Sequence, residues 1–132
     1  MVSELLISKK QNMKRELKFR AWDPINKTII SPYSIHFNSN QTVNYCIDIY
    51  MKERRDLILM QFTGLKDRNG NEIYEGDIVK PYPDEHDLAQ IIFMSGSFKI
   101  ATKKRYGDFL IWNYLESEIE VVGNIYKNPE LL

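Results

Sequence analysis

Apolar and polar residues alternate along several short stretches of this chain, which is the period-two pattern of half-buried β-strands. In the stretch 16–22, Leu17, Phe19 and Ala21 share one face, and the stretch 42–51 places five apolar residues on one face in the same way. The remaining expected strands are 28–30, 57–62, 77–80, 89–94, 98–102, 109–115 and 121–126. About nine short strands without a long helical pattern predict an all-β or β-dominated fold.

The stretch from Leu59 to Lys80 is the centre of this pattern because it joins two β-prone runs through turn-forming residues. The run 57–62 is nearly all apolar, which favours a strand covered on both faces, and Gly64 is expected to end it. Residues 67–70 have the sequence Asp-Arg-Asn-Gly, which is typical of a tight turn. We therefore expect extended chain to pair around this turn and to set the interior of the protein.

The expected strands divide into a hairpin-rich N-terminal half and a C-terminal half with the pattern of an SH3-like barrel or pseudo-barrel. The charged residues 52–56 predict an exposed turn or a single helical turn. Residues 1–12 differ in pattern from the rest of the chain, so we expect them to be a mobile N-terminal extension and residues 13–132 to form a single β domain. In the last expected strand, Gly123 is expected to form a bulge. After it, Asn128 before Pro129 predicts one helical turn with the asparagine as its cap.

Composition and charge narrow the classes of function. The 132 residues carry 18 basic and 18 acidic side chains, so the formal net charge is zero, which argues against bulk binding to a phosphate backbone. The single cysteine, Cys46, can form no internal disulfide and is expected to pack as a small hydrophobe in a reducing compartment. No apolar run has the length needed to span a bilayer, and these features together favour a cytoplasmic protein without a membrane partner.

Motifs for catalysis and for cofactor or metal binding are missing from the sequence. His36 and His86 have no second histidine or cysteine at metal-ligand spacing. His86 lies in the acidic stretch 84–87, which is better explained as a solvated loop than as a site for a hard cation. No glycine-rich phosphate loop precedes a helical pattern, and no serine stands in a nucleophile motif. We therefore expect a protein that is not an enzyme and holds neither a cofactor nor a metal.

One basic segment offers a nucleic-acid-binding alternative. Lys99, Lys103, Lys104 and Arg105 lie on or beside an expected hairpin tip, with Tyr106 next to them. Small barrels bind single strands through basic grooves with aromatic platforms, so this hairpin is a candidate nucleic-acid site. A solvated basic loop is the competing interpretation because the chain as a whole has no net charge.

Arg20 and Trp22 share one face of the expected strand 16–22. A guanidinium over an indole ring forms a cation–π contact, so we expect the two side chains to pack on each other. We prefer structural packing as the interpretation of this contact, with ligand recognition as the alternative.

Three segments, taken together and in order, resemble the YopX family of phage and prophage proteins. They are Lys18–Asp23, then Leu59–Val79 with its Asn69-Gly70 turn, and finally Glu120–Leu131. The resemblance covers residues 13–132 and leaves residues 1–12 outside the family pattern. It implies a mainly β fold and an origin in a mobile genetic element, and it brings no catalytic residue with it.

We expect from these observations a phage accessory protein, in the cytoplasm of the host cell, that works by binding another protein or by associating with itself into a homo-oligomer. Many short strands leave edges that pair readily with another chain, and the sequence carries aromatic residues but no chemical motif. The alternative is a nucleic-acid-binding module that uses the hairpin from Lys99 to Arg105.

Overall fold

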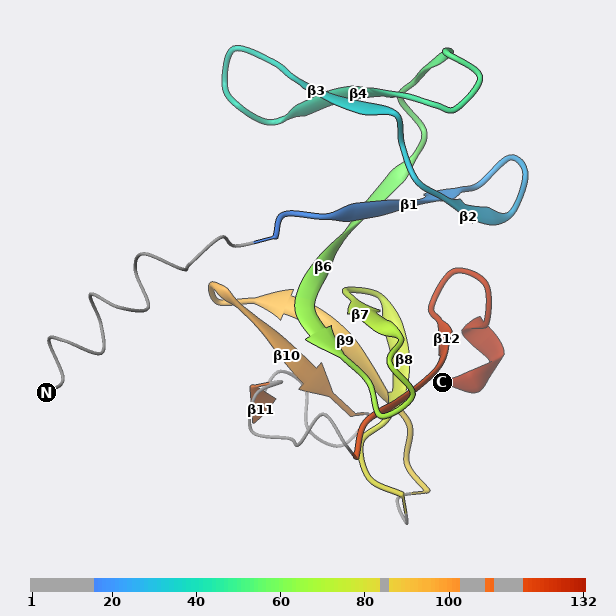
Figure 1. Cartoon of the computed structure of the whole chain (residues 1–132), viewed down its shortest axis with the longest axis vertical. Coiled ribbons are helices and arrows are strands. Elements are labelled where there is room, and N and C mark those ends of the chain that lie inside the picture. The colour runs from blue at the N-terminus through green and yellow to red at the C-terminus, as the bar shows by residue number, and fades with distance from the viewer. Residues whose placement is uncertain (1–15, 84–85, 103–108, 111–117) are drawn as a thin grey trace, which may run out of the picture.

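The computed structural model describes residues 16–83, 86–102, 109–110 and 118–132, which form twelve strands and one short 3-10 helix (Figure 1). No α-helix occurs within these ranges. The prediction of a β-dominated fold is confirmed.

The strands form three antiparallel sheets. The first contains β1 (Phe19–Asp23), β2 (Thr28–Ile30), β6 (Ile58–Lys66) and β7 (Glu72–Tyr74), in the order β2-β1-β6-β7. The second contains β8 (Asp77–Lys80), β9 (Ala89–Met94), β10 (Ser97–Ala101), β11 (Phe109–Leu110) and β12 (Glu120–Asn124), in the order β11-β10-β9-β8-β12. The third contains β3 (Ser34–Phe37), β4 (Val43–Ile47) and β5 (Glu53–Arg54), in that order. The 3-10 helix η2 (Pro129–Leu131) comes after β12.

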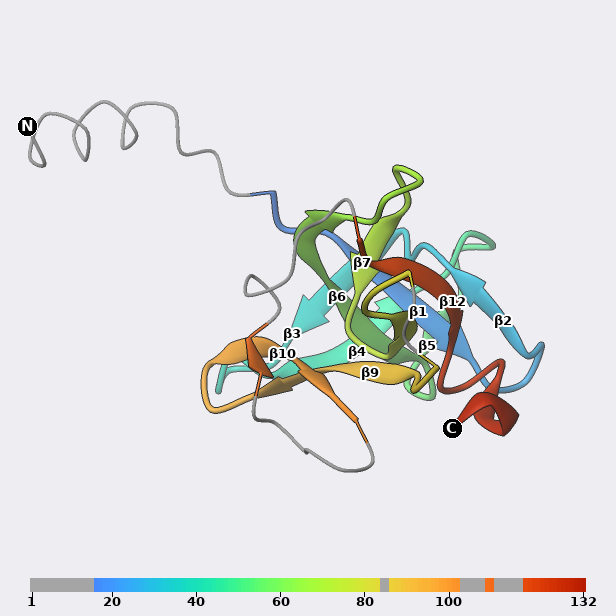
Figure 2. The ribbon, with the colours of Figure 1, turned by 90° about the horizontal axis from the view of Figure 1, so that it is seen from below.

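The third sheet lies at one end of the molecule, beyond β1 and β2 and away from β9 and β10 (Figure 1). We call residues 33–57 the outer lobe and the first and second sheets together the body. Strand β6 runs from the outer lobe past β1 to β7, and it pairs with both. Seen from below, the strands of the second sheet curl around β6 and β7 as a half-barrel (Figure 2). An SH3-like strand arrangement stays a prediction.

The second sheet and β7 build the hydrophobic core of the body. Its buried members are Ile73, Val79, Ala89, Ile91, Phe98, Ile100 and Ile119, with Leu65 and Val121 packed against them. Apolar side chains from the four consecutive strands β7 to β10 thus converge, as β-strands with one buried face require.

The central stretch pairs around its turn as predicted, but its details differ from the sequence interpretation. Strand β6 does not end at Gly64, because this glycine takes a φ of 89° within the strand and lets it continue to Lys66. Met60 and Phe62 are buried while their neighbours are partly exposed, so only one face of β6 is fully covered. The prediction of a strand buried on both faces is wrong.

Two other boundaries also differ. Residues 53–54 form strand β5 against β4 rather than a turn. Strand β4 ends at Ile47, so Ile49 and Met51 lie in the next loop instead of extending the apolar face of a strand.

The C-terminal segment confirms a bulge at Gly123, where the register between β12 and β8 shifts. A Cβ atom at Gly123 would lie 2.6 Å from Asn128 Oδ1, so only glycine fits this contact. Asn128 does not cap η2; its side-chain oxygen accepts the backbone N–H of Asn124 instead. The asparagine thus fixes the return of the chain after β12.

A buried ion pair joins the first sheet to the second. Arg20 Nη2 on β1 lies 2.5 Å from Asp77 Oδ1 at the start of β8, and the guanidinium lies 4.6 Å from the centre of the Tyr74 ring. The Asp77 side chain is only 1% exposed, and its second oxygen accepts the backbone N–H of Tyr74. Burial raises the pKa of Asp77, and the charge of Arg20 opposes that rise.

The expected contact between Arg20 and Trp22 is replaced by two others. Arg20 lies over Tyr74, while Trp22 stacks on Tyr126 with 6.1 Å between the ring centres. Both aromatic partners come from later parts of the sequence, which local strand periodicity cannot identify.

Removing core volume will test the position of the core. Ile91→Ala is expected to lower the free energy of unfolding by about 2–5 kcal/mol, because Ile91 is fully buried and its loss leaves a cavity. Val122→Ala, at a side chain that is 39% exposed, should change the free energy of unfolding by less than about 1 kcal/mol. Urea unfolding of both variants measures this, and equal losses would contradict the assignment of the core.

Removing the Arg20 guanidinium will test the buried ion pair. Arg20→Met is expected to destabilise the fold by about 3–5 kcal/mol at pH 7, because Asp77 stays buried without its cation. The pKa of Asp77 then rises further, so its protonated form is favoured in the folded state and the deficit should shrink as the pH falls towards 5. Adding Asp77→Asn should restore part of the loss. Unfolding curves at both pH values provide the measurement, and a deficit that grows in acid would refute this account.

Candidate functional site

Three turns share one hydrogen-bond pattern, and two of them lie in the outer lobe. Each begins with an Asn or Asp whose side-chain oxygen accepts the backbone N–H groups of the residues two and four positions later: Asn38, Asp48 and Asp67. The residue three positions later has a positive φ in every case: Gln41 at 62°, Met51 at 63° and Gly70 at 81°. The same local chemistry therefore closes all three loops.

Met51 occupies a backbone conformation that favours glycine. A left-handed φ costs an ordinary L-residue about 1 kcal/mol, and the equivalent position in the third turn is Gly70. Met51 is nevertheless 63% exposed, so the interior of the protein does not require its side chain.

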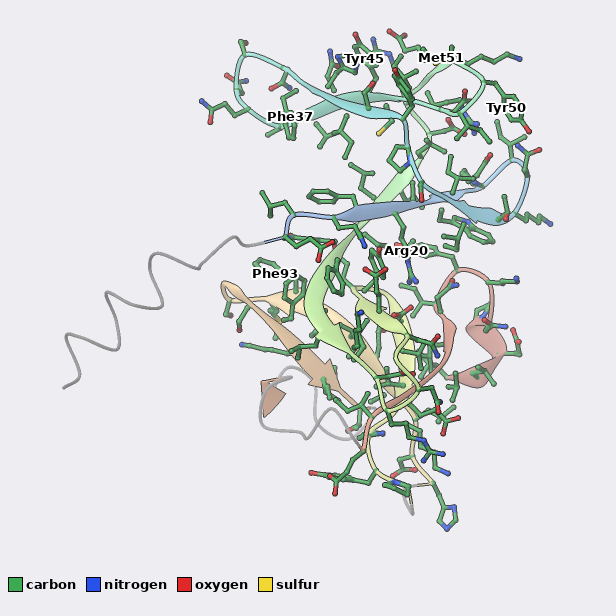
Figure 3. All side chains as sticks on the ribbon, in the orientation of Figure 1. Arg20, Phe37, Tyr45, Tyr50, Met51 and Phe93 are labelled. Atoms are coloured by element: carbon green, nitrogen blue, oxygen red, sulfur yellow. The ribbon has the colours of Figure 1, made fainter. Side chains whose placement is uncertain are left out.

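The loop 48–52 and the β3–β4 hairpin carry exposed apolar side chains along the outer lobe (Figure 3). Tyr50 is 75% exposed, Phe37 and Ile49 are 60% exposed, and Val43 is 46% exposed. We call Phe37, Val43, Ile49, Tyr50 and Met51 the outer-lobe surface. Within residues 33–57, all of which the structure describes, Cys46 is the only buried apolar residue. The lobe thus has six exposed apolar residues, Tyr33 and the five of this surface, against one that is buried.

Aromatic and cationic side chains also contact one another in the outer lobe. The rings of His36 and Tyr45 stack with their centres 4.5 Å apart, and the Arg55 guanidinium lies 5.2 Å from the centre of Tyr45. Tyr, Phe, Met and Arg are the residues that protein–protein interfaces enrich relative to other surfaces. The outer lobe is therefore rich in residue types that interfaces favour.

Arg54 attaches the outer lobe to the body through Asp23, and it also binds two carboxylates of the lobe itself, Asp48 and Asp56. Its Nη2 atom lies 2.8 Å from Asp23 Oδ1 at the end of β1 and 2.7 Å from Asp56 Oδ2, and its Nη1 atom lies 3.6 Å from Asp48 Oδ2. The Arg54 side chain is 14% exposed, and those of Asp23 and Asp48 are 3% and 6% exposed. One guanidinium therefore ties β1, the loop 48–52 and the segment before β6 to β5.

The geometry of this cluster sets its ionisation. Hydrogen bonds from Arg54, and then from Asn26 and nearby backbone N–H groups, hold the pKa of Asp23 far below its usual range. Backbone N–H groups and Arg54 lower the pKa of Asp48, and Arg54 lowers that of Asp56. The carboxylates stabilise the cation in turn and raise the pKa of Arg54. All four groups are charged at neutral pH.

Hollows lie on both sides of Arg54. One of about 570 Å³ is bounded by β2, the β1–β2 turn and the loop 48–52, and one of about 380 Å³ is bounded by β4 and residues 57–59. Arg54 lines both. Ile25 and Tyr50, at the first hollow, are more than 70% exposed, so this hollow opens beside the outer-lobe surface.

The candidate nucleic-acid hairpin lies mostly outside the described residues. Lys99 is on β10, where it pairs in register with Ile92 and Leu110 and is partly exposed. Lys103, Lys104, Arg105 and Tyr106 fall in the range 103–108, which the structure does not describe. The hairpin site stays a prediction.

Cys46 and the histidines carry no site in the described part of the chain. Cys46 is 2% exposed, and burial raises the pKa of its thiol, as expected for a packed cysteine. No group of three or more His, Cys, Asp or Glu side chains with metal-binding geometry occurs among the described residues, although 84–85 of the acidic stretch are not described. Over the same residues, no helix is long and apolar enough to cross a bilayer.

Sequence reasoning missed the outer-lobe surface because it placed Ile49 and Met51 in a strand. The signal that would have found it is Asp48, which interrupts the alternation and occupies the same turn position as Asp67 in the turn that the sequence does predict. An exposed Tyr50 then results directly from the turn geometry.

Acid should loosen the Arg54 cluster. Because the carboxylates of Asp23, Asp48 and Asp56 have lowered pKa values in the fold, their stabilisation is complete above the unfolded value of about 3.9 and is lost as the pH falls through their folded values. Amide hydrogen exchange of residues 33–57 should accelerate between pH 4 and pH 2.5 after correction for the intrinsic rate. Arg54→Met should weaken this dependence, and an unchanged profile would argue against the cluster as the attachment.

Solved structures show the same fold in other proteins. The crystal structure of protein EF1440 from Enterococcus faecalis matches with a TM-score of 0.66 and 28% identity, over 89% of this chain and 98% of that one. The crystal structure of protein yopX from Bacillus subtilis matches with a TM-score of 0.55 and 28% identity, over 86% and 96% of the two chains.

Sequence comparisons give the family. A protein of Bacillus subtilis strain 168, described as "SPbeta prophage-derived uncharacterized protein YopX", is 35% identical over 69 residues, which are 48% of this chain and 52% of that protein. The chain thus spans about half the length of the curated relative that it matches. The family model described as YopX protein matches residues 18–132, and the chain therefore belongs to the YopX family.

Proposed function

We propose that this protein is a non-catalytic accessory protein of a phage or prophage that binds protein through its outer lobe. The proposal rests on one observation: the lobe buries a single apolar residue, Cys46, while five apolar side chains of the outer-lobe surface are 46–75% exposed. Apolar surface of this kind is costly in water and marks interaction sites in soluble proteins. The prophage origin printed for the Bacillus relative supports the biological setting.

The attachment of the lobe supports the same function. A lobe packed on a shared hydrophobic core would turn its apolar residues inward, whereas the Arg54 cluster holds this lobe through charged groups. The apolar side chains stay available on the outside, and the loop that presents Tyr50 is closed by Asp48. A preorganised loop loses little conformational entropy when it binds.

The described residues provide no arrangement that favours catalysis. The buried carboxylates Asp23 and Asp77 are each paired with an arginine, and Cys46 is buried as a neutral thiol. At the larger hollow, the charged groups of Asp23, Asp48 and Arg54 are engaged with one another in holding the fold. Protein binding explains the exposed apolar and aromatic side chains better than catalysis does.

The surface can be tested by affinity capture from prophage-carrying host cells. The Tyr50→Ser variant, used as bait, is expected to capture less than a tenth of the partner protein that the wild type captures. The reason is that Tyr50 is the most exposed aromatic residue of the outer-lobe surface. Phe93→Ser is the matched control, since Phe93 is an aromatic residue 52% exposed on β9 of the body. Quantitative mass spectrometry of captured protein gives the readout. Equal capture by wild type and Tyr50→Ser would contradict the assigned surface.

A further inference from the structure

We propose that the outer lobe binds a second copy of this chain, lobe to lobe, across a two-fold axis. This inference rests on the proposed function and names its partner. A two-fold interface brings the same patch of both copies together, so the patch must be complementary to itself. Three features of the outer lobe support such an interface: its exposed apolar area, an exposed pair of opposite charges, and the backbone conformation of Met51.

The area of exposed apolar surface matches one side of a stable interface. An aromatic side chain has about 150–250 Å² of surface, so Tyr33, Phe37 and Tyr50, at 60–75% exposure, present roughly 300–500 Å². Val43, Ile49 and Met51, at 46–63% exposure, add to this area. A standard interface buries about 800 Å² on each partner. The exposed apolar side chains of the lobe are therefore of the order of size that one side of a dimer needs.

The charges of the lobe are also complementary to themselves. Glu53 and Arg55 lie two positions apart, with side chains 51% and 58% exposed and their charged atoms 3.4 Å apart. Across a two-fold axis, Glu53 of one copy can face Arg55 of the other, and the reverse contact forms at the same time. The whole chain has no net charge, so no long-range repulsion opposes the approach of a second copy.

The strained position of Met51 gives the proposal an independent support. Its φ of 63° would suit glycine, as at Gly70 in the equivalent turn. The fold gains nothing visible from this side chain, which is 63% exposed. A contact made only in the dimer explains why methionine occupies the position, since methionine adapts to an irregular apolar surface.

Sedimentation velocity of the purified protein over a concentration series tests the association. The wild type should dimerise, and Met51→Gly should raise the dimer dissociation constant at least tenfold. At a concentration where both proteins are monomeric, Met51→Gly should melt no lower than the wild type, because glycine relieves the backbone strain. Gln41→Gly is the matched control: it relieves the same strain in the loop 38–42 and should leave the dissociation constant within twofold.

Charge reversal identifies the partner as a second copy. Glu53→Arg and Arg55→Glu should each dimerise poorly alone, because like charges then face each other across the axis. An equimolar mixture of the two variants should form heterodimers, since each changed side chain meets its opposite. Arg68→Glu, at an exposed pair on the body whose charged atoms lie 3.7 Å apart, serves as the control and should dimerise like the wild type.

The outcomes separate this inference from the function on which it rests. A wild type that stays monomeric at all concentrations, or a mixture of variants that fails to associate, overturns the dimer. If Tyr50→Ser still loses captured protein from cells in that case, protein binding by the lobe stands with another partner. If capture is also unchanged, the proposed function falls as well.

Discussion

The guanidinium of Arg54, set among three carboxylates, is the interaction on which the arrangement of this protein depends. It binds Asp23 of the body and Asp56 of the lobe at hydrogen-bond distance, with Asp48 of the loop nearby. A buried arginine needs such partners because an unpaired charge is expensive to bury. This contact attaches the lobe to the body through charged groups, while the apolar side chains of the outer-lobe surface are exposed.

The body is stabilised mainly by its hydrophobic core, in contrast to the charged contact that attaches the lobe. Its core of apolar side chains from β7 to β10 is supplemented by a buried ion pair, Arg20 with Asp77. Asp67 closes the β6–β7 turn and also accepts the backbone N–H of Val121, which ties the central hairpin to β12. The central stretch thus does organise the body, and it does so through one carboxylate as well as through strand pairing.

Strand periodicity and turn chemistry were enough to predict the β fold, the turn at Asp67 and the bulge at Gly123, because each of these is decided by residues close in sequence. The partners of Arg20 could not be found in this way. Tyr74 and Asp77 lie more than fifty positions later and reach Arg20 only through the pairing of β1 with β6. The family resemblance supplied the fold class and no site.

The outer lobe was misread for a related reason. An apolar residue at every second position from Val43 to Met51 is the pattern of one long strand, and it fits equally well a shorter strand followed by a loop that exposes apolar residues. Asp48 decides between them, because its carboxylate closes the turn and its position beside Arg54 holds the loop against the body. The residue that interrupts the strand pattern is therefore also the one that shapes the surface: the buried carboxylate of Asp48 closes the loop in which Tyr50 and Met51 are exposed.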